Sequence, residues 1–315
     1  MADLTPTPAS LPAAATPSPE PPRRRGLWLD AARPKTLPAA IAPVLVGVAL
    51  AAEQGAFHAL AAACALLGAV LIQIGTNFSN DAEDFVRGAD TEARKGPLRA
   101  TAAGLVTPGQ MRAAAAVAFG LAFASGIYLI VRGGWPILAL GLAAIASGYA
   151  YTKGRYALAY TGLADLFVLV FFGPVAVAGT FYVQALTLPL WVPVAGLGPG
   201  FLATAILLAN NVRDVEEDRA ADKRTLVVRF GRPVGVRLYN ACISGAVVVP
   251  ASLYLVARAH PGILAASVLA ALLGRRLTRT LSTTSDPAVL NPLLGKTAGL
   301  LFLYSAVFAL GWVLT

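Results

Sequence analysis

Nine apolar runs, each about as long as a membrane-spanning helix, constrain this chain of 315 residues more than any other feature. A helix needs roughly 20 apolar residues to cross the hydrocarbon core of a bilayer. Charged residues make up 13% of the chain, whereas an ordinary soluble domain has about 25%. We therefore predict an all-α polytopic membrane protein with about nine transmembrane helices, near residues 34–53, 57–80, 110–132, 135–152, 158–181, 190–211, 236–257, 260–275 and 293–314.

The first 25 residues differ in composition from the rest of the chain. They are rich in proline, alanine, threonine and serine, and they end in three arginines. They lack the apolar core that a signal peptide would have. We expect residues 1–25 to form a disordered cytoplasmic tail and residues 26–315 to form one transmembrane domain.

The basic residues are distributed unevenly over the predicted topology. With the N-terminus placed inside, 23 of the 25 lysines and arginines fall in inner segments, and only Arg132 and Arg258 lie outside. An excess of Lys and Arg on the cytoplasmic side is the usual topology signal of membrane proteins. Topology therefore explains the net charge of +9, and we expect membrane lipids and no nucleic acid as partners.

Ten of the 16 acidic residues gather in two clusters, each at the cytoplasmic end of an even-numbered predicted helix. Residues three or four positions apart lie on the same face of a helix. Asn and Asp side chains in both clusters have this spacing, so each helix end presents amides and carboxylates together. The first cluster contains Asn77, Asn80, Asp81, Asp84 and Asp90, and the second contains Asn210, Asn211, Asp214, Asp218 and Asp222.

Crowded carboxylates repel one another unless a cation lies between them. A charged side chain at the bilayer centre costs about 2.5–3.5 kcal/mol even on a lenient scale. Oxygen ligands suit Mg²⁺, which takes one or two carboxylates and shares its other positions with water and phosphate. Two cysteines and two histidines are too few for a thiolate zinc site. The nearby cations that suit the oxygens of a diphosphate are Arg94, Lys95, Arg99, Lys223 and Arg224.

This arrangement fits the ionisation of an allylic diphosphate, because the metal and the basic groups stabilise charge on the departing diphosphate. Simpler interpretations exist for each part: an acidic loop can be merely solvated, and a basic residue can serve topology alone. A transporter that binds a translocated cation is a further alternative. Transporters usually place such carboxylates near the membrane midplane, whereas these lie at helix ends.

Four segments of the sequence resemble the UbiA-type intramembrane prenyltransferases. They are residues 32–43 (ARPKTLPAAIAP), 80–99 ending in GPLR, 165–174 (DLFVLVFFGP) and 210–226 (NNVRDVEEDRAADKRTL). The resemblance covers roughly residues 28–314. It implies nine helices around a central cavity in a bacterial cytoplasmic (inner) membrane, with both acidic motifs and the active site facing the cytoplasm.

By this resemblance, six carboxylates would bind Mg²⁺ and four of them would be catalytic. One spacing departs from the commoner family pattern, in which the third aspartate follows the second by four residues, because Asp90 follows Asp84 by six. The metal ligands would be Asp81, Asp84, Asp90, Asp214, Asp218 and Asp222, and the catalytic residues would be Asp81, Asp84, Asp214 and Asp218. The family has diphosphate-side cations at the positions of Arg94, Arg99, Lys153, Lys223 and Arg224.

The resemblance also implies the substrates. A polyprenyl diphosphate would donate its chain to 1,4-dihydroxy-2-naphthoate, with release of diphosphate and CO₂, to give demethylmenaquinone. Alternative acceptors with the same fold are 4-hydroxybenzoate, homogentisate and a haem. Arg33 would bind the acceptor unless it serves topology, and Asp165 would lie beside the acceptor unless it pairs with a tyrosine or with Lys153. The other side chains expected to contact substrate are Asn77, Asn80, Asn210 and Asn211.

Overall fold

The computed structural model describes residues 26–89, 99–151, 157–257 and 260–315, and every regular element in these ranges is helical. The predicted all-α class is therefore confirmed. The first elements are α1 (Leu27–Ala32), η1 (Pro34–Thr36), α2 (Pro38–Glu53), α3 (Ala59–Val86), α4 (Pro108–Gly133), α5 (Trp135–Ala150), α6 (Leu158–Thr161), α7 (Ala164–Val170), η2 (Phe171–Val175) and α8 (Ala176–Ala185). The remaining elements are α9 (Trp191–Arg213), α10 (Val215–Ala220), α11 (Leu226–Phe230), α12 (Arg232–Ala257), η3 (Pro261–Ile263), α13 (Leu264–Thr283) and α14 (Pro287–Leu314).

Seven helices in the described ranges are long and apolar enough to cross a membrane. The segment Leu27–Thr36 and α2 meet at a bend of 51° and form an eighth candidate if they are counted as one span. The remaining predicted span, 135–152, corresponds to α5, which has 16 residues. At 1.5 Å per residue α5 is about 24 Å long, shorter than the roughly 30 Å hydrocarbon core. The number of nine spans therefore stays a prediction.

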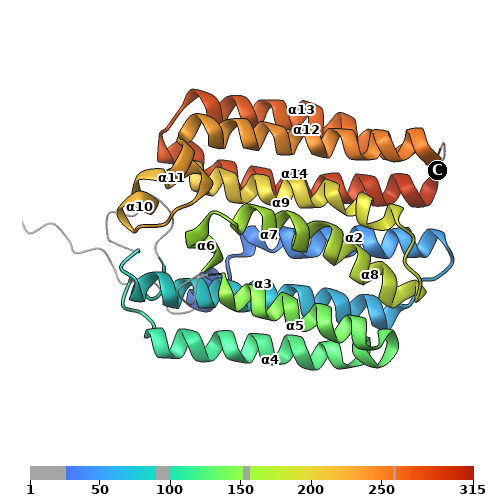
Figure 1. Ribbon diagram of the computed structural model, residues 1–315, viewed down its shortest axis with the longest axis horizontal. Coiled ribbons are helices and arrows are strands. Elements are labelled where there is room, and N and C mark those ends of the chain that lie inside the picture. The colour runs from blue at the N-terminus through green and yellow to red at the C-terminus, as the bar shows by residue number, and fades with distance from the viewer. Residues whose placement is uncertain (1–25, 90–98, 152–156, 258–259) are drawn as a thin grey trace, which may run out of the picture.

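The helices lie nearly side by side and form layers (Figure 1). α12 and α13 pack together on one side, and α9 and α14 form the next layer. α2 packs against both α14 and α8, whereas α3, α4 and α5 pack together at the opposite side. The short helices α10 and α11 lie at one end of the long helices, and the C-terminus lies at the other end.

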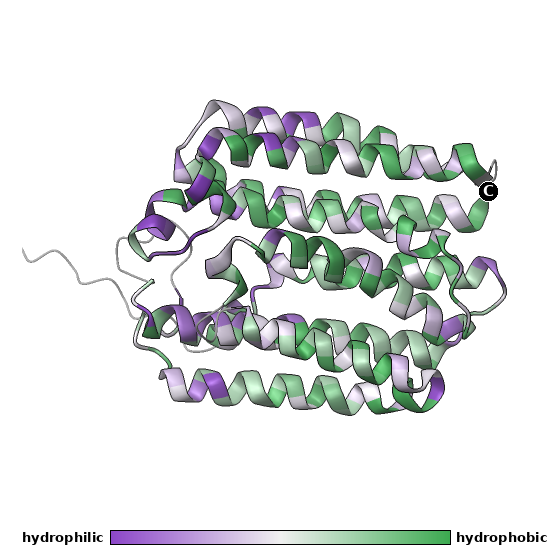
Figure 2. Cartoon of the chain, in the orientation of Figure 1, coloured by the Kyte–Doolittle hydropathy of each residue, from purple (hydrophilic) through white to green (hydrophobic). Residues whose placement is uncertain are grey.

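Hydrophilic residues gather most densely at the end that holds α10 and α11 (Figure 2). The middle of the long helices is mainly hydrophobic. α3 continues past its predicted end at residue 80 and carries Asp81, Glu83 and Asp84 in its last turns, all of them buried. The helix can continue through these charges because each carboxylate has a partner in the fold. Glu83 accepts a hydrogen bond from Arg112 Nε at 2.7 Å, and the partners of Asp81 and Asp84 are described below.

A bend within Ala164–Ala185 brings this span against α9. η2 is a turn of π-helix that contains Pro174, which has no amide hydrogen to donate. A Cβ atom on Gly173 would lie 2.7 Å from the carbonyl oxygen of Gly196 in α9, so a glycine is required at this contact. Beside it, Phe167 and Phe171 stack with 5.8 Å between their ring centroids.

Candidate functional site

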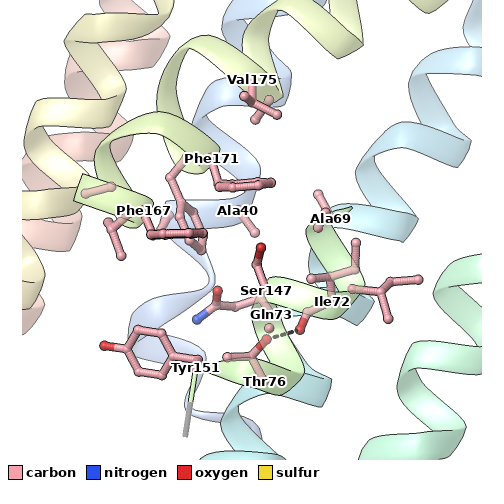
Figure 3. A pocket seen from close by; sticks show the side chains of 18 of the residues that line it. Ala40, Ala69, Ile72, Gln73, Thr76, Ser147, Tyr151, Phe167, Phe171 and Val175 are labelled. Atoms are coloured by element: carbon pink, nitrogen blue, oxygen red, sulfur yellow. Dashed lines mark hydrogen bonds between the residues drawn. The ribbon is translucent and has the colours of Figure 1, made fainter. Parts of the chain in front are cut away.

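A cavity of about 410 Å³ lies between α2, α3, α4, α5, α7–α8 and α9. Most of its wall is formed by Ala, Gly, Leu, Ile, Val and Phe side chains. In Figure 3, Gln73, Thr76 and Tyr151 lie together in one part of the cavity, and Phe171 and Val175 lie further along. The polar residues of the wall include Arg33, Thr36, Gln73, Thr76, Asn77, Asn80, Asp84, Arg99, Tyr151, Asp165, Asn210, Asn211, Asp218, Lys223 and Thr225.

One face of α3 follows the cavity along its length. Cavity-lining residues recur on it at helical spacing from Ala65 to Asp84, which corresponds to about 28 Å of helix. The face is apolar from Ala65 to Ile72 and polar from Gln73 to Asp84. The cavity therefore suits a ligand with a charged head and a long apolar tail.

Asp84 lies at the centre of the polar end and is 2% exposed. Its carboxylate accepts hydrogen bonds from Arg99 Nη1 at 2.5 Å and from Lys223 Nζ at 3.1 Å. The hydroxyl of Tyr160 in α6 donates to Asp84 Oδ1 at 3.0 Å. Tyr160 thereby adds an uncharged donor to the two cations that contact this carboxylate.

Lys223 joins the two acidic clusters. Its ammonium nitrogen lies 3.1 Å from Asp84 Oδ2 and 4.0 Å from Asp218 Oδ1, and it also lies 5.3 Å from the ring centroid of Tyr160. The side chain of Lys223 is only 12% exposed. Asp84 and Asp218, 134 positions apart in the sequence (218 − 84), therefore share one cation at the cavity wall.

Asp214 takes part in a different, buried network. Arg213 donates to both of its carboxylate oxygens, from Nε at 2.5 Å and from Nη2 at 2.6 Å. The same guanidinium donates to Asn210 Oδ1 at 2.8 Å and to Asn291 Oδ1 at 3.0 Å. Arg213 and Asp214 are 5% and 4% exposed. This network fastens the end of α9 to the start of α14.

Asp81 faces away from the cavity wall towards the turn that follows residue 98. Its carboxylate accepts hydrogen bonds from the backbone amides of Ala100 at 3.2 Å and Thr101 at 3.1 Å. Asp81 is 2% exposed, so these contacts satisfy a buried charge. Asp81 thereby positions the segment that brings Arg99 to Asp84.

Asp165 lies in the first turn of α7, at the cavity wall. It is 7% exposed, and within the described ranges neither carboxylate oxygen has a hydrogen-bond partner on another residue. A buried polar group without a partner costs about 1–3 kcal/mol, and more when it is charged. Such a group in a cavity wall is suited to accept a hydrogen bond from a ligand.

The cavity brings together ten of the predicted site residues. Asp81 and Asp214 are buried close to it but do not line it. Asp222 and Arg224 form an exposed ion pair of 3.2 Å on the surface, so the structure does not bring them to the cavity. Asp90, Arg94, Lys95 and Lys153 lie outside the described residues. The ten residues in the wall are Arg33, Asn77, Asn80, Asp84, Arg99, Asp165, Asn210, Asn211, Asp218 and Lys223.

Several residues of the site were not singled out from the sequence. Tyr160 and Tyr151 belong to a short stretch with no recognisable pattern, and Arg213 was counted only as a topology charge. Gln73 is a polar residue in an apolar run, and its one signal is its position four residues before Asn77, on the same helix face. Thr36 has only one signal as well, its position three residues after Arg33.

The oxygen ligands at the cavity suit one kind of metal site, in which the protein supplies few ligands and a bound substrate supplies others. Within the described residues, no group of three or more His, Cys, Asp or Glu is placed to hold an ion. Two carboxylates, Asp84 and Asp218, do line the cavity and share Lys223. Mg²⁺ takes one or two carboxylates and completes its coordination with water and phosphate oxygens. The residues therefore fit a Mg²⁺ ion that binds together with a phosphate-containing ligand.

The fold and the cavity define an integral membrane protein. One end of its cavity, here called the mouth, is charged and suits a metal ion, and it contains Asp84, Arg99, Asp218 and Lys223. The rest of the cavity, here called the chamber, is long and apolar. A family model described as the UbiA prenyltransferase family matches residues 40–305. The chain belongs to this family.

Relatives and solved structures agree with this assignment. The chain is 38% identical over 294 residues to 1,4-dihydroxy-2-naphthoate octaprenyltransferase of Escherichia coli (strain K12), covering 91% of this chain and 95% of that protein. It is 41% identical over 218 residues to the protein of the same name from Mycobacterium tuberculosis, covering 69% and 74%. A UbiA homolog from Archaeoglobus fulgidus, bound to DMAPP and Mg²⁺, matches 90% of this chain and 99% of its own with a TM-score of 0.61 and 19% identity. This last likeness shows a shared fold.

We predict that Arg213→Met strongly destabilises the protein. Removing one partner of a buried ion pair leaves the other charge unpaired and costs about 3–5 kcal/mol. The matched control is Arg219→Met, because Arg219 forms an exposed pair of 2.6 Å with Glu216, worth about 0–1 kcal/mol. The free energy of unfolding in detergent micelles measures both changes. Equal effects of the two substitutions would contradict the structural role of Arg213.

Proposed function

We propose that this protein transfers a polyprenyl group from polyprenyl diphosphate to 1,4-dihydroxy-2-naphthoate, releasing diphosphate and CO₂ and giving demethylmenaquinone. The observation that carries the proposal is the single cavity in which a charged mouth continues into an apolar chamber. The relatives from E. coli and M. tuberculosis are named for this acceptor, and the archaeal homolog is bound to a prenyl diphosphate and Mg²⁺.

The polyprenyl diphosphate would place its head at the mouth and its tail along α3. Arg99 and Lys223 line the polar end of the cavity and would bind diphosphate oxygens, with Arg94, Lys95 and Lys153 as further proposed cations. Arg224, which pairs with Asp222 on the surface, would take part only after leaving that partner. The isoprene tail would lie along the apolar face from Ile72 to Ala65. Burying the tail among apolar side chains is favourable, although the bilayer offers the tail a similar environment. The charged mouth therefore has to supply much of the selectivity.

Asp84 and Asp218, which line the cavity, would hold Mg²⁺ directly, and Asp90 stays a proposed ligand. Asp81 and Asp214 are bonded to backbone amides and to Arg213, and Asp222 pairs with Arg224 on the surface. These three would join the ion only after a change of partner. When bound, the ion would neutralise charge on the departing diphosphate. Arg99 and Lys223 both contact Asp84, so a diphosphate bound to an ion at Asp84 would lie beside both cations. Preorganised cations of this kind stabilise a leaving group without reorganising during the reaction.

The acceptor would bind between Arg33 and Asp165, which line the same cavity. The guanidinium of Arg33 suits a carboxylate, because it can donate two parallel hydrogen bonds. The unpartnered carboxylate of Asp165 would accept a hydrogen bond from a ring hydroxyl. This hydrogen bond places negative charge beside the ring and favours attack on a cation. Asn77, Asn80, Asn210 and Asn211 would complete the substrate contacts.

The proposed reaction balances without an added oxidant or base. The bond between C1 of the prenyl chain and the diphosphate oxygen breaks, and diphosphate leaves with the electron pair. The ring carbon that bears the carboxylate then bonds to C1. Loss of CO₂ from that carbon returns an electron pair to the ring and restores its aromaticity. The transfer itself ends at the quinol. Conversion of this quinol to demethylmenaquinone is a separate two-electron oxidation, with dioxygen or another external acceptor as the oxidant.

We also propose the topology. Nine spans, with α5 as a short fourth and residues 27–53 as the first, would leave the tail of residues 1–25 inside and Thr315 outside a bacterial cytoplasmic membrane. The location of α10 and α11 at the end opposite the C-terminus supports this arrangement. The polar mouth of the cavity would then face the cytoplasm, where a water-soluble acid can enter.

We predict that the purified protein consumes 1,4-dihydroxy-2-naphthoate far better than 4-hydroxybenzoate when one polyprenyl diphosphate and Mg²⁺ are supplied. Mass spectrometry of the product should show the prenylated ring without its carboxyl group, and a ¹³C-labelled carboxylate should appear as CO₂. Arg33→Ala should raise the KM for the naphthoate by roughly tenfold, because a charge-assisted hydrogen bond is worth about 1.5–3 kcal/mol. Equal use of the two acids would favour the general aromatic-acceptor alternative.

We predict that cysteines placed at Ala89 and Ala220 are labelled only from the cytoplasmic side. Cysteines at Gln54 and Thr187, in the turns at the opposite end, should be labelled only from outside. The measurement uses a membrane-impermeant maleimide on cells and on inverted vesicles, in a background without Cys64 and Cys242. Labelling of Ala89 and Ala220 positions from opposite faces would exclude a site built from both clusters.

A further inference from the structure

The turn that places Arg33 in the cavity wall has an unusual backbone conformation. Arg33 has φ 53 and ψ 69, in the left-handed region, which residues with a Cβ atom rarely adopt. Pro34 follows, and a residue before proline is disfavoured in the right-handed helical region, so α1 ends here. Left-handed conformations of this kind persist where the surrounding structure holds them, often at functional sites.

Both peptide groups that flank the Cα atom of Arg33 are held by hydrogen bonds. The carbonyl of Ala32, before Arg33, accepts from Asn77 Nδ2 at 2.8 Å. The carbonyl of Arg33 itself accepts from the Thr36 amide at 2.8 Å and from Thr36 Oγ1 at 2.9 Å. Because peptide groups are planar, their orientations set φ and ψ of the residue between them. These bonds therefore fix the direction in which the Arg33 side chain leaves the backbone.

Thr36 is in turn fastened to α3. Its Oγ1 accepts from Asn77 Nδ2 at 3.0 Å and from Gln73 Nε2 at 3.2 Å. A threonine hydroxyl has one hydrogen to donate and two lone pairs to accept with, and all three are used here. Asn77 is 3% exposed and uses its amide nitrogen on both sides of the turn. The network therefore couples α3 directly to the backbone of Arg33.

We infer that Thr36 and Asn77 are positioning residues that hold Arg33 in the orientation in which it binds the carboxylate of the aromatic acceptor. The inference rests on the proposed function, and it gives Asn77 a role through Arg33 instead of through substrate contact alone. A guanidinium that is already oriented loses less freedom when it binds a planar carboxylate. Loosening the turn should therefore weaken binding of the acceptor and leave binding of the diphosphate substrate almost unaffected.

The experiment compares Thr36→Val, Thr36→Ser and the control Thr204→Val in the purified full-length protein. Thr204 is also buried, but its hydroxyl bonds only within its own helix, to the carbonyl of Gly200 at 2.9 Å. Thr36→Val should raise the KM for the naphthoate roughly tenfold, the loss expected when one charge-assisted contact is misplaced. The KM for the polyprenyl diphosphate should change less than about twofold. Thr36→Ser, which keeps the hydroxyl, should restore normal values, and Thr204→Val should change neither KM.

Two further measurements separate positioning from general damage. In an Arg33→Ala background, Thr36→Val should add no further loss, because both changes act on the same contact. Hydrogen exchange of the amides of Arg33, Lys35 and Thr36 should be faster in Thr36→Val. It should also be faster in Asn77→Ala, which serves if Thr36→Val does not fold. Equal losses for both substrates, additive losses with Arg33→Ala, or unchanged exchange would each overturn the inference. If exchange is faster in the variants but the wild type does not use the naphthoate, Thr36 and Asn77 still hold the turn at Arg33, and it is the proposed function that fails.

Discussion

The site depends on one buried charge, the carboxylate of Asp84. Three partners from separate parts of the chain meet on it: Arg99 after the first cluster, Tyr160 in α6 and Lys223 after the second cluster. A buried carboxylate without partners would cost several kcal/mol, so the folded protein needs these groups together. Because Asp84 is in the first cluster and Lys223 follows the second, pairing this charge also brings the two acidic clusters together. A diphosphate with Mg²⁺ would enter a mouth whose charges are already paired and oriented.

The charged mouth and the apolar chamber exist because the cavity-facing residues of the helices are polar at one end and apolar along the rest of their length. The chamber is lined from α2, α3, α4, α5, α7–α8 and α9, whereas its charged residues lie near the end that holds α10 and α11. Small residues let these helices approach closely, as Gly173 does against Gly196. Asp165 and Arg33 both line this cavity, and the proposed reaction needs them beside the place where an allylic carbon and an aromatic ring would be brought together.

The sequence predicted the parts of the site that have a helical spacing. Asp84 and Asp218 were expected at two helix ends facing one side, and the cavity does bring them together through Lys223. Side-chain partners distant in sequence could not be predicted. The spacing of residues gives no indication that Arg213 binds Asn291 or that Tyr160 donates to Asp84. The predicted number of membrane spans was limited in the same way, since hydropathy alone did not reveal that α5 has only 16 residues.

The most direct test of a shared diphosphate site is a double-mutant cycle between Asp84→Asn and Asp218→Asn. The quantity measured is the rate of diphosphate release with saturating naphthoate and Mg²⁺. The rate of each single variant should fall at least about 100-fold, as when one charge-stabilising group is removed. The rate of the double variant should be no more than about tenfold below that of the slower single variant, because the effects of groups that act as a unit are not additive. Losses that multiply, or a near-normal rate in either single variant, would contradict a site in which both clusters hold the same diphosphate.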